Sequence, residues 1–240
     1  MKTKLSNDYK ADLELNITHI REKIEEAKKD AKGQDVTLLC ATKTVPAEVI
    51  NYVTENFGIT DIGENRVQEL LEKYDELNLE NVNLHFIGSL QTNKVKYIID
   101  KVCMIHSLDS VRLAKEIDRQ AKKIGKVMDV LVEVNIGEEE NKGGISPGEL
   151  ESFLDEISVF DNIRVRGLMT IAPNCEGNAE YSKYFEKTYA FFIDILPKKI
   201  HNIYSPILSM GMSDSFETAI KCGSNLIRLG TVIFGRREYK

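Results

Sequence analysis

The sequence predicts an α/β protein that folds as a single (β/α)8 barrel of the TIM type, with one extra helix at its N-terminus. Eight short apolar segments alternate with helical patterns along the chain. The segments are nearly continuous apolar runs, which is typical of parallel strands buried on both faces. The length of 240 residues suits one such barrel, since these barrels reach about 250 residues. An open doubly wound sheet is the alternative, because a strand count from one sequence can be wrong by one or two.

Residues 1–35 are predicted to form a helical segment that packs on the barrel. Within residues 7–31, apolar side chains recur at helical spacing among many charged ones, and Gly33 is expected to end the helix. The recurring apolar residues are Leu13, Ile17, Ile20, Ile24 and Ala27. No Pro/Ser-rich linker or low-complexity tract interrupts the sequence, so we expect one domain over residues 1–240.

Eight segments are predicted as strands because each is short, apolar and followed by a helical pattern. They are residues 36–42, 59–63, 84–88, 102–106, 127–136, 163–171, 207–210 and 226–233. Between them, Pro46 is expected in the first turn of a helix. Asp109 and Asp214 are expected to cap helices, and Asp214 stands three residues before Glu217, the spacing of a capping box.

Charge, hydropathy and cysteine spacing exclude several classes of protein. The formal net charge is -6, which repels nucleic acid. No segment approaches the roughly 20 apolar residues that cross a bilayer. The four cysteines lie far apart without a CxxC pair, which favours reduced thiols over disulfides or a zinc site. We therefore expect a cytoplasmic protein that binds neither nucleic acid nor a membrane.

The histidines do not predict a metal site. His19, His85, His106 and His201 form no HxxxH or HExxH pair. His85 and His106 belong to predicted strands, and we interpret them as hydrogen-bonded residues of the barrel wall. No GxSxG motif is present, so no hydrolase nucleophile is predicted.

Functional side chains of this fold lie at the carboxyl ends of the strands, and Lys43 is the first candidate there. It follows the first predicted strand and precedes Pro46, which opens the next helix. A lysine at the edge of a barrel can be partly desolvated, which frees its amine to attack a carbonyl group. The alternative is a lysine that simply reaches water, and Lys43 alone does not decide between them.

The last two predicted strands end in loops that suit a phosphate group. Loops after the seventh and eighth strands of this fold often bind phosphate through backbone N–H groups, hydroxyls and a helix N-terminus. Ser209, Ser213 and Thr231 can donate hydroxyl hydrogen bonds, while Gly211 and Gly230 let the backbone approach a ligand. The alternative is that these residues only cap a helix and form turns.

Arg228 lies inside an apolar run, where an unpaired charge would cost several kcal/mol. It must therefore face a partner, which is either a structural carboxylate or a bound ligand. A lysine amine, a phosphate site and an arginine at one barrel mouth suggest pyridoxal 5'-phosphate (PLP). That cofactor needs an anchor for its aldehyde, a phosphate site and a group at its ring nitrogen.

Six short motifs resemble the pyridoxal-phosphate homeostasis protein family, which is related to the N-terminal barrel of alanine racemase. They are TKT at 42–44, GENRVQE at 63–69, HFIGSLQTNK at 85–94, GLM at 167–169, LSMGMS at 208–213 and RLGT at 228–231. They occur in order over residues 36–239, and together they are far more specific than any one of them. The resemblance implies a (β/α)8-type barrel that carries PLP on a lysine and has no established catalytic reaction.

The resemblance also assigns roles to individual residues. Lys43 would form the Schiff base, Arg228 would meet the ring nitrogen, and Asn65 would line the pocket. Ser209, Gly230 and Thr231 would bind the phosphate. No catalytic residue is implied, and the expected partners are PLP and apo-forms of PLP-dependent enzymes, with the protein itself a monomer.

The anchor motif departs from the family at one position. Many members have Lys-Thr-Lys-Pro there, whereas Val45 replaces the second lysine in this chain. Position 45 therefore supplies no auxiliary amine in this chain. Lys142 matches another family lysine on the loop after the fifth strand, but we favour its interpretation as a solvated loop residue.

Two functions of different classes follow, a PLP carrier and a PLP-dependent amino-acid racemase. Racemisation needs a base on each face of the cofactor, and Lys43 can serve only one. In alanine racemases the other base is a tyrosine near a second, C-terminal domain, for which we expect no residues after the last predicted strand. An arginine at the ring nitrogen also weakens the electron sink that carbanion chemistry uses. Both expectations favour the carrier.

Overall fold

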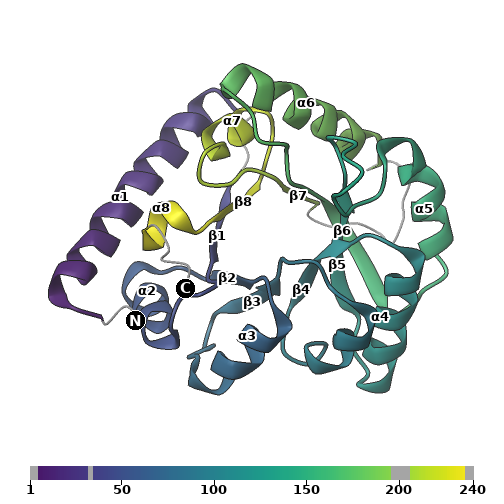
Figure 1. Cartoon of the computed structure of the whole chain (residues 1–240), viewed down its shortest axis with the longest axis horizontal. Helices are drawn as coiled ribbons and strands as arrows, with labels where there is room; N and C mark the ends of the chain where they lie inside the picture. The colour runs from purple at the N-terminus through teal and green to yellow at the C-terminus, as the bar shows by residue number, and fades with distance from the viewer. Residues whose placement is uncertain (1–4, 32–34, 196–205, 236–240) are drawn as a thin grey trace.

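The computed structural model describes residues 5–31, 35–195 and 206–235, and within them the strands form one closed parallel barrel. The strands follow the order of the chain around the barrel, and β8 pairs with β1 (Figure 1). They are β1 Thr37–Ala41, β2 Asp61–Glu64, β3 Asn83–Phe86, β4 Met104–Leu108, β5 Met128–Val134, β6 Ile163–Thr170, β7 Ile207–Ser209 and β8 Leu226–Leu229. The predicted (β/α)8 barrel is confirmed, and the open doubly wound sheet is not formed.

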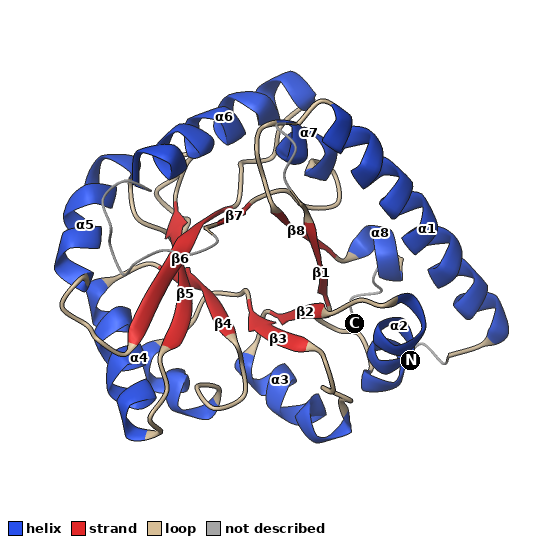
Figure 2. Ribbon diagram, turned by 180° about the vertical axis from the view of Figure 1, so that it is seen from behind, coloured by secondary structure: helices blue, strands red, loops and turns tan. Residues whose placement is uncertain are grey.

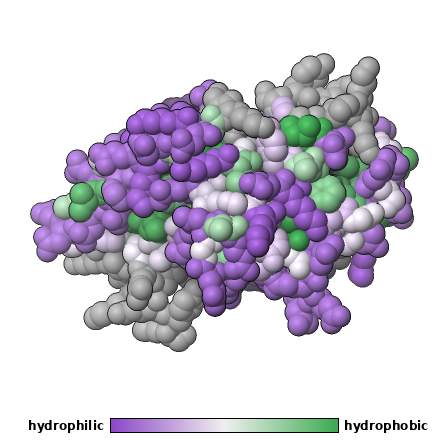
Figure 3. Space-filling view, turned by 90° about the horizontal axis from the view of Figure 1, so that it is seen from above, coloured by the Kyte–Doolittle hydropathy of each residue, from purple (hydrophilic) through white to green (hydrophobic). Residues whose placement is uncertain are grey.

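Helices surround the strands on the outside (Figure 2). The α-helices are α1 Asn7–Lys29, α2 Ala47–Phe57, α3 Val67–Lys73, α4 Val111–Lys123, α5 Leu150–Ile157, α6 Asn178–Ile195, α7 Phe216–Lys221 and α8 Thr231–Phe234. Three short 3-10 helices, η1 Tyr74–Glu76, η2 Thr92–Tyr97 and η3 Pro147–Glu149, lie between them. The surface in Figure 3 is mainly hydrophilic with scattered hydrophobic side chains, as is normal for globular proteins.

The extra N-terminal helix is α1, which lies against α7 and α8 (Figure 1). Its buried residues are the five that the periodicity predicts, and Ser6 caps it by accepting a hydrogen bond from the backbone N–H of Tyr9. An ion pair between Lys23 and Glu217 of α7, 2.7 Å long, adds a polar contact at its edge. Gly33, the expected helix end, lies outside the described residues.

The predicted last strand, 226–233, is wrong in its second half. β8 ends at Leu229, and after Gly230 the chain turns into α8. Ile233 and Phe234 are buried there, and their carbonyl oxygens accept hydrogen bonds from side chains of α1. An apolar run alone does not distinguish a strand from a short helix that another helix covers.

Three predicted helix starts shift by one residue. Pro46 is the N-cap of α2 and does not lie within its first turn. Ser110, not Asp109, caps α4 by accepting a hydrogen bond from the N–H of Leu113. Ser215, not Asp214, precedes α7, and its hydroxyl accepts a hydrogen bond from the loop before it instead of capping the helix. Local spacing cannot decide between adjacent capping residues, because the path of the incoming loop selects one of them.

The barrel interior is partly apolar and partly polar. Strand residues of the main hydrophobic core alternate with interior-facing ones, as strand geometry requires. Two small apolar clusters fill part of the interior, Leu39, Ile87 and Leu226 in one and Met104, Leu131 and Met169 in the other. Other interior positions carry Asp61, His85, His106, Ser209 and Arg228, all of them buried. The interior therefore provides polar support directly beneath the barrel mouth.

Candidate functional site

The six residues expected at the site lie at the carboxyl ends of β7, β8, β1 and β2, which are consecutive in the closed barrel. Ser209 ends β7, Arg228 belongs to β8, Gly230 and Thr231 follow β8, Lys43 follows β1 and Asn65 follows β2. Because the carboxyl ends of parallel strands meet at one mouth, the structure brings these residues into one sector.

Lys142 does not belong to this sector. It lies on the loop after β5, where its side chain is exposed and forms an ion pair of 2.7 Å with Glu139. β5 is separated from both β1 and β8 by other strands. The interpretation of Lys142 as a solvated loop residue agrees with this position.

Lys43 is presented by a tight turn after β1. The N–H of Val45 donates a hydrogen bond of 3.0 Å to the carbonyl of Thr42, and Lys43 and Thr44 form the turn between them. Thr44 has φ 65°, in the left-handed region that β-branched residues rarely adopt. Such a conformation costs about 1–3 kcal/mol and persists only where other contacts impose it. Here the N–H of Thr44 is bound by the carboxylate of Glu69.

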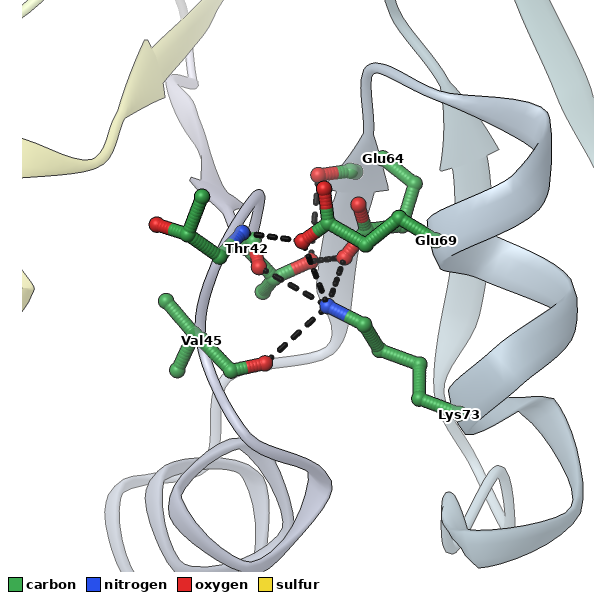
Figure 4. Close-up of polar contacts among 7 residues, drawn as sticks. Thr42, Val45, Glu64, Glu69 and Lys73 are labelled. Atoms are coloured by element: carbon green, nitrogen blue, oxygen red, sulfur yellow. Dashed lines mark hydrogen bonds and ion pairs between the residues drawn. The ribbon is translucent and has the colours of Figure 1, made fainter. Parts of the chain in front are cut away.

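The side chain of Lys73 binds this turn through hydrogen bonds. Its ammonium group reaches from α3 into the space between the β1 turn and the end of β2, as Figure 4 shows. There Nζ donates hydrogen bonds to the carbonyl oxygens of Thr42 at 3.1 Å and Val45 at 3.0 Å. It also contacts the carboxylates of Glu64 at 2.8 Å and Glu69 at 3.1 Å. The lysine thus fixes both ends of the turn that carries Lys43.

Glu64 is the main anionic partner of Lys73, and it is fully buried. Burial raises the pKa of Glu64, although Lys73 and a hydrogen bond of 2.6 Å from the Thr42 hydroxyl oppose the shift. Oε1 makes both contacts, while Oε2 is buried with no hydrogen-bond partner among the described residues. The charge of Lys73 is therefore what stabilises the Glu64 carboxylate in this position.

Sequence reasoning did not identify Lys73, although a signal was present. The buried residues of α3 are Val67, Leu70 and Lys73, at intervals of three along the helix. A lysine at the apolar position of a helix is a buried lysine, and a buried lysine needs anionic or carbonyl partners. Glu64 and Glu69 both lie in the GENRVQE segment that precedes it.

Arg228, near the end of β8, lies in the same sector and is buried in the barrel interior. Its guanidinium donates hydrogen bonds from one nitrogen to the Ser209 carbonyl at 2.9 Å and hydroxyl at 2.6 Å. The other terminal nitrogen donates to the Thr170 carbonyl at 3.0 Å. Burial lowers the pKa of Arg228 to about 10, and the charge of Glu133 opposes the shift. Its hydrogen-bond partners in the described part of the chain are oxygens at the ends of β6 and β7, and the structural carboxylate that was one alternative is not among them.

The two loops predicted to bind phosphate, after β7 and after β8, differ in what their residues do in the structure. Gly230 is the N-cap of α8, and Thr231 begins that helix with an exposed side chain. The first N–H groups of a helix have no partner inside it. Gly211 has φ 94°, and a Cβ there would lie 2.6 Å from the Cβ of Ala219. The glycine at 211 is therefore required by its backbone conformation and by its packing against α7, which agrees with the turn role that the sequence left open.

A carboxylic acid at the mouth was also missed. Glu133 lies near the end of β5 inside the run Val130–Val134, and the half-buried Asp109 follows β4. Burial and the charge of Asp109 raise the pKa of Glu133 to about 7, although Arg228 opposes the shift. An acid with this pKa exchanges a proton near neutral pH. The glutamate within an apolar strand was the signal in the sequence.

His85 and His106 face the barrel interior and are hydrogen-bonded to each other, with 2.9 Å between Nδ1 of His85 and Nε2 of His106. Within the described residues, no three His, Cys, Asp or Glu side chains are arranged to hold a metal ion. None of the helices in the described ranges combines the length and the apolar character needed to cross a membrane.

Comparisons with known proteins agree on one family. The model of the alanine racemase N-terminal domain matches residues 15–238. The pyridoxal phosphate homeostasis protein of Aquifex aeolicus is 44% identical over 225 residues, which are 93% of this chain and 97% of that protein.

Two solved structures share the fold over nearly the whole chain. A protein of unknown function from Bifidobacterium adolescentis has a TM-score of 0.89 at 30% identity and covers 96% of this chain and 98% of its own. PipY of Synechococcus elongatus, solved with PLP bound, has a TM-score of 0.76 at 29% identity and covers 93% of this chain and 100% of its own.

We expect Lys73→Met to lower the free energy of unfolding by about 3–5 kcal/mol, because it leaves the Glu64 carboxylate buried without a cation. Adding Glu64→Gln should restore part of the loss, since an amide needs no counter-charge. Urea unfolding followed by circular dichroism measures both effects. Lys23→Met is the control: its ion pair is half-exposed and should contribute less than about 1 kcal/mol. Equal losses in Lys73→Met and Lys23→Met would contradict the buried-pair account.

Proposed function

The chain belongs to the family of pyridoxal phosphate homeostasis proteins, and from this membership we propose that it binds PLP and serves PLP homeostasis as a carrier or regulator without a catalytic reaction of its own. One observation carries the proposal: an amine, a guanidinium and a helix N-terminus converge at four adjacent strand ends. The PLP bound in the structure of PipY supports the identity of the ligand.

The donor set of this sector fits the three recognisable parts of PLP. When bound, PLP supplies an aldehyde that forms a Schiff base with an amine while water leaves. Lys43 provides the amine, Arg228 provides hydrogen-bond donors, and the start of α8 provides N–H groups for a phosphate. The two other positions considered for an amine do not compete with Lys43. Position 45 is a valine, which has no amine, and Lys142 lies outside the sector.

Lys43 is proposed to hold PLP covalently through Nζ. Its backbone is fixed by the turn that Lys73 and Glu69 support, so the direction of its side chain is limited before the ligand arrives. Preorganisation of this kind reduces the conformational entropy lost on binding. Asn65 follows the adjacent strand and is proposed to line the pocket beside Lys43.

The phosphate is proposed to bind at Ser209, Gly230 and Thr231. Thr231 has an exposed hydroxyl and stands at the N-terminus of α8, where N–H groups favour an anion. Ser209 is fully buried, and its hydroxyl accepts a hydrogen bond from Arg228, so it has a single hydrogen left to donate. Thr231 should therefore contribute more to phosphate affinity than the Ser209 hydroxyl.

Arg228 is proposed to meet the ring nitrogen of PLP. Three of its five N–H groups are used by Ser209 and Thr170, so others are available. A cationic donor keeps the ring nitrogen unprotonated and so weakens carbanion stabilisation. This supports a carrier over an enzyme, as do the family relatives, whose names state homeostasis and no reaction.

The second candidate function is a PLP-dependent amino-acid racemase, and Glu133 favours it. The sequence offered Lys43 as the only base, whereas Glu133 lies at the same mouth with a pKa of about 7. A group of that pKa can accept or donate a proton at neutral pH. The two functions are therefore to be separated by experiment.

We further propose that the protein acts as a monomer in the cytoplasm and delivers PLP to apo-forms of PLP-dependent enzymes. All four cysteines are free, which suits a reducing compartment. Burial raises the pKa of the Cys40 thiol to about 12, which keeps that thiol protonated and unreactive.

Borohydride reduction of the PLP-loaded protein, followed by peptide mapping, should place the pyridoxyl group on Lys43. Lys43→Ala should lose the Schiff-base absorbance, whereas Lys142→Ala, the control, should retain it. A label found mainly on other lysines would contradict the assignment.

Thr231→Val should weaken PLP binding by about 1–3 kcal/mol, because the phosphate loses a hydrogen-bond donor. Pyridoxal without phosphate should bind poorly to both proteins, and its affinity should not change with the substitution. Thr37→Val, at the opposite end of β1 and also exposed, is the matched control. Fluorescence titration measures the affinities, and equal losses for both ligands would show that Thr231 acts through the fold.

Mixing the PLP-loaded protein with an apo-form of a PLP-dependent enzyme should restore that enzyme's activity, and Lys43→Ala should alter the transfer. Interconversion of alanine enantiomers, followed by chiral chromatography, should stay far below the usual turnover of about 10 per second. Racemisation at an enzymatic rate that both Lys43→Ala and Glu133→Gln abolish would establish the racemase instead.

A further inference from the structure

Five buried side chains form a continuous hydrogen-bonded chain through the barrel interior. Asp61 Oδ1 lies 3.0 Å from Nε2 of His85, and Nδ1 of His85 lies 2.9 Å from Nε2 of His106. Nδ1 of His106 lies 3.5 Å from the Ser209 hydroxyl, which accepts the 2.6 Å hydrogen bond from Arg228. The chain thus joins a carboxylate at the start of β2 to the guanidinium beneath the mouth.

The hydrogen-bond donors of this chain all point one way. Burial lowers the pKa of His106 well below its ordinary value, so the ring is neutral and carries one N–H. The Ser209 oxygen has two lone pairs, so it can accept from Arg228 while its single hydrogen is donated to Nδ1 of His106. That nitrogen accepts, and the His106 hydrogen is therefore on Nε2 and is donated to His85.

The same reasoning fixes His85. Its Nδ1 accepts from His106, so its own hydrogen is on Nε2 and is donated to the Asp61 carboxylate. Asp61 is an acceptor on every side, since Asn83 donates to Oδ1 at 3.1 Å and Thr60 to Oδ2 at 2.7 Å. Hydrogen bonds from the three neighbouring side chains therefore favour the carboxylate form of Asp61. Because the Asp61 carboxylate can only accept, this is the one direction in which each histidine ring carries a single hydrogen.

We propose that Asp61, His85 and His106 are positioning residues that orient the Ser209 hydroxyl and, through it, the Arg228 guanidinium. If the chain ran in reverse, His106 would donate from Nδ1 to the Ser209 oxygen, and the Ser209 hydrogen would lose its acceptor in the chain. The Ser209 hydroxyl, which accepts from Arg228, would then no longer be held in one rotation by a donation of its own to His106. Asp61 also lines a surface pocket at the amino ends of β1 and β2, so the chain connects that end of the barrel with the mouth.

The functional consequence rests on the proposed PLP site, because Arg228 is the proposed partner of the ring nitrogen. The direction of the hydrogen bonds does not depend on that site, since it is a property of the protein without ligand. A phosphate oxygen that takes the Ser209 hydrogen would do so at the expense of His106. The two statements can therefore be tested separately.

The first test is ¹⁵N NMR of the histidine side chains in the unliganded protein at neutral pH. We expect His85 and His106 each to be neutral with the hydrogen on Nε2, whereas the exposed His19 should show averaged tautomers. An Nδ1–H tautomer or a charged ring at His85 or His106 would overturn the proposal. This measurement needs no variant, so it decides even if the substitutions below impair folding.

The second test uses two substitutions of Asp61. Asp61→Asn keeps an oxygen that can accept from His85 and should leave both tautomers unchanged. Asp61→Leu removes the acceptor, so His106 should lose its single tautomer and PLP affinity should fall about fivefold, the equivalent of one buried hydrogen bond. Borohydride labelling should still fall on Lys43, and His19→Gln should change nothing. Unchanged tautomers and affinity in Asp61→Leu would refute the positioning role, whereas failure of the parent to bind PLP would refute only the proposed function.

Discussion

The pairing of β8 with β1 is the contact on which the rest of the structure depends. Leu39 lies opposite Arg228 and Cys40 opposite Leu229 in this parallel pair, which closes the barrel. Closure places the turn that carries Lys43 beside the start of α8, although these segments lie near opposite ends of the sequence. An open sheet of the same strands would separate the Lys43 amine from the N–H groups proposed to bind phosphate, so the proposed site exists only in the closed fold.

Two buried polar networks support this sector from different sides. The ammonium of Lys73 holds the β1 turn through Thr42 and Val45, and its charge is balanced by Glu64. On the other side, Arg228 is held by the ends of β6 and β7 and by the histidine chain beneath them. Buried polar groups of this kind are costly unless they are fully paired, and pairing then restricts them to one arrangement. These contacts hold the β1 turn and the Arg228 guanidinium in place.

The sequence predicted what depends on local pattern and on position in the fold. The apolar spacing in α1 identified its buried face. Position at the strand ends made Lys43 and Arg228 candidates, and the barrel brings both to one mouth, while their roles stay predictions. Lys73 was missed because its partners include the β1 turn and the end of β2, which are distant in sequence. The only sign of these tertiary contacts in the sequence is a charged residue at an apolar position of a helix. The helix α8 was missed for a related reason: its apolar residues are buried by α1, which a local pattern does not reveal.

A crystal structure of the protein soaked with PLP tests the central claim most directly. The account predicts continuous electron density from Nζ of Lys43 to the aldehyde carbon of the ligand. It also predicts the phosphate at Gly230 and Thr231 and the ring nitrogen within hydrogen-bond distance of Arg228. Density for PLP elsewhere, for example on Lys142 at the loop after β5, would contradict the account.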